Sequence, residues 1–197
     1  MSGHFIAIEG LDGCGSTTQI RLLGERFPHW HRTAEPSQGP AGLLIREALR
    51  GENPLPDSVL PYLFAADRKD HLEREIEPAL AEGVNVVTDR YYASSMAYQA
   101  LIAPLDRIVL LNQDFRSPDL TIFLDISPVN ALERIIARGQ AIERFETLDH
   151  LREIAAGFGL AFALLADRGE AIEVVDATGT QEEVHLRIVE TLERCLP

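Results

Sequence analysis

A glycine-rich segment near the N-terminus, Gly10-Leu-Asp-Gly-Cys-Gly-Ser-Thr-Thr18, has residue types that could bind a phosphate chain. Its glycines let the backbone curl so that N–H groups face phosphate oxygens, and the helix start that follows adds partial positive charge. Thr17 stands where such loops place the hydroxyl that binds magnesium. Ser16 stands where they place a lysine, and a serine hydroxyl donates a single neutral hydrogen bond. The segment therefore predicts phosphate binding with a weakened charge for phosphoryl transfer.

Two other interpretations of this segment stay open. It could be a glycine-rich turn between a strand and a helix that binds nothing. It could also be a dinucleotide-binding loop, because Gly13 and Gly15 precede a helix and Glu35 follows about twenty residues later. Thr18 stands in the place of the third glycine of that motif, which weighs against this alternative.

Asp89-Arg90-Tyr91 follows a β-branched run at residues 84–88. Open α/β sheets bind their ligands at the carboxyl ends of buried strands, and this triplet lies at such an end. The acid could hold magnesium or its water, and the arginine could clamp a phosphate. A solvated Asp–Arg pair is the alternative.

Phe64 and Arg68 lie four residues apart on a predicted helix, so both side chains point to one helical face. The ring could stack on a nucleobase while the guanidinium donates hydrogen bonds to it. Taken alone, a helical phenylalanine is more often in the core and an arginine more often on the surface.

Arg134, Arg138 and Arg144 flank a polar, charged connector at residues 139–145. Phosphoryl-transfer enzymes use arginine-bearing lids to neutralise charge and to expel water. The pattern predicts a lid at about residues 134–146, with a solvated amphipathic helix as the alternative.

Strands and helices alternate along the whole chain, which is typical of a parallel sheet covered by helices on both faces. We therefore expect a single α/β domain over residues 1–197, without repeats or linkers. The expected strands are 5–9, a second that ends at 33–34, 84–88, 120–124 and 171–175. The expected helices are 17–27, 41–50, 57–82, 93–101, 105–114, 128–138 (with Ser127 as its N-cap), 146–168 and 181–196.

Composition narrows the classes of partner. The formal net charge of −13 argues against non-specific binding to nucleic acid or to an anionic membrane. No apolar run approaches the length of a membrane span, and the N-terminus has no basic region followed by an apolar core, because Glu9 and Asp12 interrupt the only candidate. A cytoplasmic protein is therefore expected. Cys14 and Cys195 form no disulfide framework. Lys69 is the sole lysine, so arginines must meet a phosphorylated substrate.

Together these motifs resemble the thymidylate kinase family, whose members transfer a phosphoryl group from ATP to dTMP. The resemblance implies the three-layer P-loop nucleoside monophosphate kinase fold, with a parallel five-stranded sheet flanked by helices. It also implies a magnesium cofactor and a homodimer. The matching segments run in order along nearly the whole chain: residues 5–15, Thr33-Ala-Glu-Pro36, Leu63-Phe-Ala-Ala-Asp-Arg68, Asp89-Arg-Tyr-Tyr-Ala-Ser-Ser-Met-Ala-Tyr-Gln99, Pro118–Asp125, Ala131-Leu-Glu-Arg134, Arg144-Phe-Glu146 and Val175-Asp-Ala177.

The resemblance also implies roles for individual residues. Phe64 would stack on thymine, Arg68 would donate to the base, and Tyr98 would lie against the deoxyribose. The acceptor-binding residues are Asp12, Phe64, Arg68, Arg90, Tyr98 and Gln99. The ATP-binding residues are Gly10, Gly13, Cys14, Gly15, Ser16, Thr17 and Thr18. The residues expected to act in catalysis are Asp12, Arg90, Arg138 and Arg144, and those expected to bind magnesium are Thr17, Asp89 and Glu146.

This chain departs from the family pattern at four places. Ser16 replaces the loop lysine, Ala34 replaces a frequent arginine, Ile136 falls in a lid that is often richer in arginine, and residues 100–103 replace a glycine-rich loop. A lid arginine could occupy the place of the lysine. Two alternatives to an active dTMP kinase therefore stay open: a degenerate nucleotide-binding paralogue that acts as a sensor or partner-binding module, and a kinase for another nucleoside monophosphate.

Overall fold

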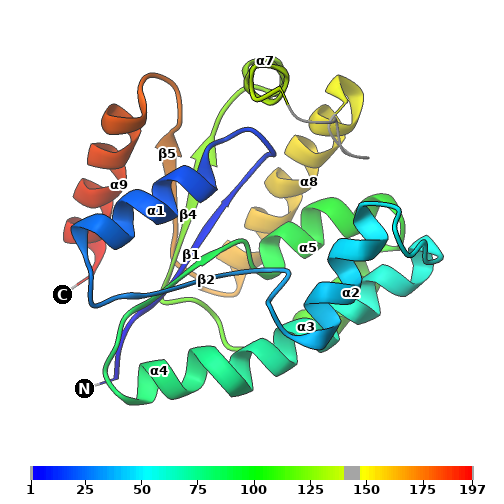
Figure 1. The fold of residues 1–197 in the computed structure, drawn as a ribbon, viewed down its shortest axis with the longest axis horizontal. Coiled ribbons are helices and arrows are strands. Elements are labelled where there is room, and N and C mark those ends of the chain that lie inside the picture. Colours follow the sequence, from blue (N-terminus) through cyan, green and yellow to red (C-terminus); the bar gives the residue numbers. More distant parts are fainter. Residues whose placement is uncertain (1, 140–146, 197) are drawn as a thin grey trace.

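The computed structural model describes residues 2–139 and 147–196. Its centre is a five-stranded, all-parallel sheet in the order β2-β3-β1-β4-β5 (Figure 1). The predicted fold class is thereby confirmed. The strands are β1 Phe5–Gly10, β2 His31–Ala34, β3 Val86–Asp89, β4 Leu120–Asp125 and β5 Ile172–Asp176.

Helices cover both faces of the sheet. α1 and α9 pack together on one face, and α5 and α8 pack together on the other (Figure 1). No helix of the described segments is long and apolar enough to cross a lipid bilayer. The helices are α1 Ser16–Arg26, α2 Pro40–Leu49, α3 Leu60–His71, α4 Glu77–Ala81, α5 Tyr92–Tyr98, α6 Leu105–Asn112, α7 Pro128–Ala137, α8 Leu148–Asp167 and α9 Gln181–Cys195.

The helix expected over residues 57–82 is not one regular helix. A 3-10 turn at Asp57–Val59 leads into α3, and a π-helical segment at Leu72–Ile76 separates α3 from α4. A π-helical turn inserts an extra residue and changes the direction of the side chains that follow, and such turns are frequent at functional sites. Sequence periodicity alone did not reveal this interruption.

Strand register brings the predicted motifs to one edge of the sheet. Ile8 of β1 pairs with Asp89 of β3, and Ala34 of β2 pairs with the same Asp89. The chain leaves β1 into the glycine loop, β3 into Arg90, and β2 into Glu35. Because the strands are parallel, these three exits meet at the carboxyl edge, where α/β sheets bind ligands.

β1 is buried along its full length and forms the centre of the core. Five of its six residues suit a strand that is covered on both faces, but Glu9 is a fully buried acid. The expected N-cap of α7 is confirmed, because the Ser127 hydroxyl accepts a hydrogen bond from the backbone N–H of Asn130 at 3.1 Å.

Candidate active site

The glycine loop between β1 and α1 forms one wall of a cavity of about 630 Å³. Gly13 and Gly15 have φ angles of 84° and 97°, in the left-handed region that favours glycine. A Cβ at Gly13 would also lie 2.4 Å from the carbonyl oxygen of Ala131 on α7. The loop therefore needs glycine at residue 13 for two reasons: backbone conformation and close packing against α7.

The lining of this larger cavity also includes residues that the sequence motifs did not indicate. Ile135 of α7 and the start of α9 line it together with Arg134 and Arg138. The full set from the β5–α9 region is Gly179, Thr180, Gln181 and Val184. A connection at the far end of the chain has no local motif for nucleotide binding, so only the fold brings it to the loop.

The Arg134 side chain is hydrogen-bonded to the glycine loop. Its Nη1 donates to the carbonyl oxygen of Cys14 at 3.3 Å, and its Nη2 donates to that of Ala177 at 2.8 Å. Arg134 thus joins α7, the glycine loop and the segment after β5. Arg138, one turn further on, lines the cavity. The predicted lid residues Arg144 and Glu146 lie outside the described residues.

Two residues proposed for magnesium are adjacent. The Thr17 hydroxyl donates to Oδ2 of Asp89 at 2.7 Å. Oδ1 of Asp89 is buried without a hydrogen-bond partner among the described residues, and a buried oxygen of this kind normally has one. Across residues 2–139 and 147–196 there is no cluster of three His, Cys, Asp or Glu side chains that could hold a metal by itself. The pair therefore fits Mg²⁺, which binds through few protein oxygens together with water and substrate phosphates.

A smaller cavity of about 220 Å³ lies beside the first. Asp12 and Arg90 line both cavities, so they mark the junction between them. Half-buried Phe64 contributes a ring to the smaller cavity. Its other walls come from the β2–α2 connection, the end of α2, α3, the residue before α5, α5 itself and the segment after α5: Glu35, Pro36, Leu49, Leu60, Arg68, Tyr91, Ser94, Ser95, Tyr98, Gln99 and Ile102.

Arg90 is fixed at this junction. Its φ of 70° is unusual for a residue with a side chain. Nη2 donates to Asp12 Oδ1 at 2.6 Å, and Nη1 donates to the carbonyl oxygen of Gly10 and to Ser94 Oγ, both at 3.0 Å. Burial alone would lower the pKa of Arg90, but Tyr98, Asp12 and other neighbours hold it well above its usual value. The guanidinium is therefore a permanent cation between the cavities.

Tyr98 closes the same junction. Its hydroxyl donates to Asp12 Oδ2 at 3.1 Å and accepts from the backbone N–H of Asp12 at 3.2 Å. Burial raises the pKa of the Tyr98 phenol well above its usual value, so the hydroxyl stays protonated. Arg90 lies over its ring at 4.9 Å from the centroid. The predicted residues Asp12, Arg90 and Tyr98 thus form one cluster.

Glu9 holds Tyr91 and Ser94, which lie beside this cluster, through hydrogen bonds. Sequence reasoning did not identify it as a site residue. Its Oε1 accepts from the backbone N–H groups of Tyr91 and Ser94, at 3.0 and 3.2 Å, and its Oε2 accepts from the Ser94 hydroxyl. It thereby caps the start of α5, whose own N-cap residue supplies no side-chain bond. An acid inside an apolar strand was the available signal.

Arg68 lies deeper in the smaller cavity than expected for a surface arginine, with 1% of its area exposed. Nε donates to Glu35 Oε2 at 2.9 Å, Nη2 donates to the same oxygen and to Ser95 Oγ, and Nη1 donates to Asn112 Oδ1. These bonds use four of the five N–H groups of a guanidinium and leave one on Nη1. Gln99 donates to Ser95, but its Oε1 is buried without a partner among the described residues.

Comparisons with known proteins identify the relatives of this chain. The sequence model of the thymidylate kinase family matches residues 8–188. A probable thymidylate kinase of Pyrobaculum calidifontis is 43% identical over 194 residues, which cover 98% of this chain and 97% of that protein. A thymidylate kinase of Xanthomonas campestris pv. campestris is 39% identical over 188 residues, which cover 92% of this chain and 79% of that protein.

The fold has a solved counterpart. The structure of thymidylate kinase from Candida albicans superposes with a TM-score of 0.82 at 26% sequence identity, and the match covers 98% of this chain and 92% of that one. The predicted resemblance is therefore confirmed at the level of sequence and of fold. The chain belongs to the thymidylate kinase family, a group of ATP-dependent nucleoside monophosphate kinases.

Proposed function

We propose that this chain transfers the γ-phosphoryl group of ATP to dTMP, giving ADP and dTDP. The observation that carries this proposal is a pair of adjacent cavities that share Asp12 and Arg90. One cavity has a phosphate-binding loop and the other has an aromatic ring with polar groups around it. A phosphoryl group bound at the shared wall would be within reach of ligands in both, as a direct transfer requires.

The unused polar groups of the smaller cavity favour thymine. Arg68 has one remaining N–H donor, and Gln99 has an acceptor oxygen without a partner. Thymine offers a carbonyl oxygen at C4 and an adjacent N–H at N3, which is the complementary pattern. Cytosine has an amino group at C4 and an unprotonated nitrogen at N3. Its amino group would therefore face the N–H donor of Arg68, and its N3 would face the acceptor oxygen of Gln99. Phe64 would stack on the base.

The junction suits a deoxynucleotide monophosphate. Arg90 is a half-buried cation that would pair with the acceptor phosphate. The hydrogen-bonded Tyr98 and Asp12 occupy the space beside the sugar, which favours a ring without a 2′-hydroxyl. The phosphate of dTMP carries most of its second negative charge at neutral pH, so its oxygen can attack in line without a general base. The chain contributes positioning and charge.

On the donor side we propose that the glycine loop, Ser16 and Thr18 included, binds the phosphates of ATP. Thr17 and Asp89 would hold Mg²⁺, which would supply positive charge to offset that of the phosphates. Ser16 cannot supply the cation that a lysine gives. Arg138 lines this cavity, and we propose that it supplies that charge together with Arg144. Glu146 would assist the metal. The roles of Arg144 and Glu146 remain predictions, because both lie outside the described residues.

The decisive experiment is a steady-state ADP-release assay with ATP, Mg²⁺ and dTMP on the native chain and on Ser16→Lys. Comparison acceptors are dUMP, dCMP and AMP. We expect the native chain to turn over dTMP selectively. Turnover by Ser16→Lys alone would favour a degenerate nucleotide-binding paralogue, which the missing lysine suggests. Preference for another acceptor would point to a different nucleoside monophosphate kinase.

We further propose that the chain is one domain, that it acts in the cytoplasm, and that it forms a homodimer. Support for the dimer comes from apolar side chains on two helices that pack together. Tyr62 on α3 is 52% exposed and Leu110 on α6 is 62% exposed. Light scattering of the native chain and of Leu110→Glu tests this: the native mass should be twice the chain mass, and the variant should be a monomer.

A further inference from the structure

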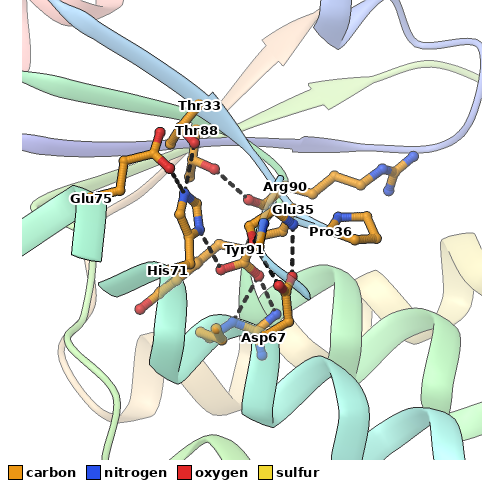
Figure 2. Close-up of polar contacts among 12 residues, drawn as sticks. Thr33, Glu35, Pro36, Asp67, His71, Glu75, Thr88, Arg90 and Tyr91 are labelled. Carbon is orange, nitrogen blue, oxygen red and sulfur yellow. Dashed lines mark hydrogen bonds and ion pairs between the residues drawn. The ribbon is translucent and has the colours of Figure 1, made fainter. Parts of the chain in front are cut away.

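The carboxylate of Glu35 lies between the buried side chains of Arg68 and His71 on α3. Figure 2 shows Glu35 beside His71. Its Oε2 accepts the hydrogen bonds from Arg68, and its Oε1 lies 3.3 Å from Nδ1 of His71. The side chains of Arg68, Glu35 and His71 are 1%, 2% and 0% exposed. Water therefore cannot substitute for any of these bonds, and Arg68 and Glu35 depend on each other for charge compensation.

His71 is itself held from its other side. Its Nε2 lies 2.6 Å from the Thr33 hydroxyl and 3.6 Å from Glu75 Oε2. Figure 2 shows the His71 ring between these residues and Glu35. Both ring nitrogens are thus occupied and the ring has one orientation. The π-helical segment that begins at Leu72 follows directly. A continuous series of contacts leads from half-exposed Glu75 to the guanidinium of Arg68.

From this arrangement we propose that Glu35 is a positioning residue for base recognition, and that His71 holds Glu35 in place. The proposal rests on the proposed function, because it requires a nucleobase in the smaller cavity. A guanidinium with free donors can pair with two neighbouring acceptors, such as O6 and N7 of guanine. Arg68 is occupied by Glu35, Ser95 and Asn112, so it presents a single N–H. A single donor suits the lone C4 carbonyl of thymine and gives no advantage to a purine.

Glu35→Gln tests this directly, because the amide has the same shape but no charge and places a donor against Arg68 or His71. We expect KM for dTMP to rise about 10- to 100-fold, the cost of a misplaced charged hydrogen bond. We expect kcat and KM for ATP to change by less than about threefold. The preference for dTMP over dGMP, as a ratio of kcat/KM values, should fall by at least about tenfold.

His71 provides a second test that leaves the Glu35–Arg68 pair intact. His71→Leu removes the group beside Glu35 Oε1 and should raise KM for dTMP by about three- to tenfold. His71→Asn places an amide near the position of Nδ1 and should restore most of the native KM. These variants keep the proposal testable if Glu35→Gln does not fold, which thermal unfolding followed by circular dichroism will show.

Asp67→Asn is the matched control. Asp67 is buried next to Arg68 in the sequence, and its two oxygens accept from the backbone N–H and the hydroxyl of Ser37, at 2.7 and 2.6 Å. In the variant the amide oxygen can accept from the Ser37 N–H and the amide nitrogen can donate to the Ser37 hydroxyl, so a buried charge is removed while the Glu35–Arg68 bonds stay in place. KM for dTMP should therefore stay near the native value. An equal rise of KM in Asp67→Asn and Glu35→Gln would overturn the proposal, as would an unchanged KM in Glu35→Gln. Failure of the native chain to phosphorylate dTMP would instead refute the proposed function.

Discussion

Replacing Glu9 with glutamine should remove a pH dependence of folding stability. Burial raises the pKa of the Glu9 carboxyl from 4.5 to about 7, although the hydrogen bond from Ser94 and the charge of Arg90 act in the opposite direction. Between these two pH values the folded state binds the proton that the unfolded state has lost. The contribution of Glu9 to stability is therefore complete below pH 4.5 and is lost as the pH rises to about 7.

The size of this effect follows from the two pKa values. Each pH unit is worth about 1.4 kcal/mol, so the full loss is about 3 kcal/mol. Glutamine preserves the contacts, because its amide oxygen can accept from the N–H groups of Tyr91 and Ser94 while its amide nitrogen donates to the Ser94 hydroxyl. Glutamine cannot ionise, so the variant should not lose this stability as the pH rises.

Urea unfolding of the native chain and of Glu9→Gln between about pH 5.5 and pH 8 measures this. We expect the native unfolding free energy, minus that of the variant, to fall by about 2 kcal/mol across that range, mostly below about pH 7. Subtraction cancels the titration of the other carboxyl groups. Parallel curves for the two proteins over the whole range would show that Glu9 does not titrate there, and the reasoning from its burial would be wrong.

Three further predictions concern the donor cavity. Gly13→Ala should lower the unfolding free energy by about 2 kcal/mol or more in urea titrations, because its Cβ would meet the Ala131 carbonyl oxygen at 2.4 Å in a left-handed conformation; unchanged stability would contradict the packing. Cys14 is 2% exposed and burial raises the pKa of its thiol to about 11, whereas Cys195 is half-exposed. Iodoacetamide at pH 8 should therefore label Cys195 in the folded chain and Cys14 only after unfolding, as peptide mass spectrometry can show. Asp89→Asn should lower kcat about 100-fold and raise the Mg²⁺ concentration needed for half-maximal activity; an unchanged Mg²⁺ requirement would remove Asp89 from the metal site.

Local sequence patterns determined most of the architecture. The strand at residues 5–9, the glycine loop and the helix that follows were predictable because strand hydrophobicity, turn conformation and helix start all depend on neighbours in the chain. The Ser127 N-cap, which the structure confirms, was predictable for the same reason. Phe64 and Arg68 share a cavity because helical periodicity places them on one face. Family resemblance then assigned roles that spacing alone left open.

Tertiary structure decided what depends on partners far apart in the sequence. The sequence contains Glu9, Glu35 and Asn112 without any sign of their partners, because each meets an arginine or a helix end contributed by another element. The π-helical segment after His71 also escaped periodicity. Burial changes the energy of a charge far more than its neighbours in the chain do. The sequence therefore indicates which residues can bind phosphate and base. The packing of the sheet and helices determines which of their hydrogen-bond donors remain available to a ligand.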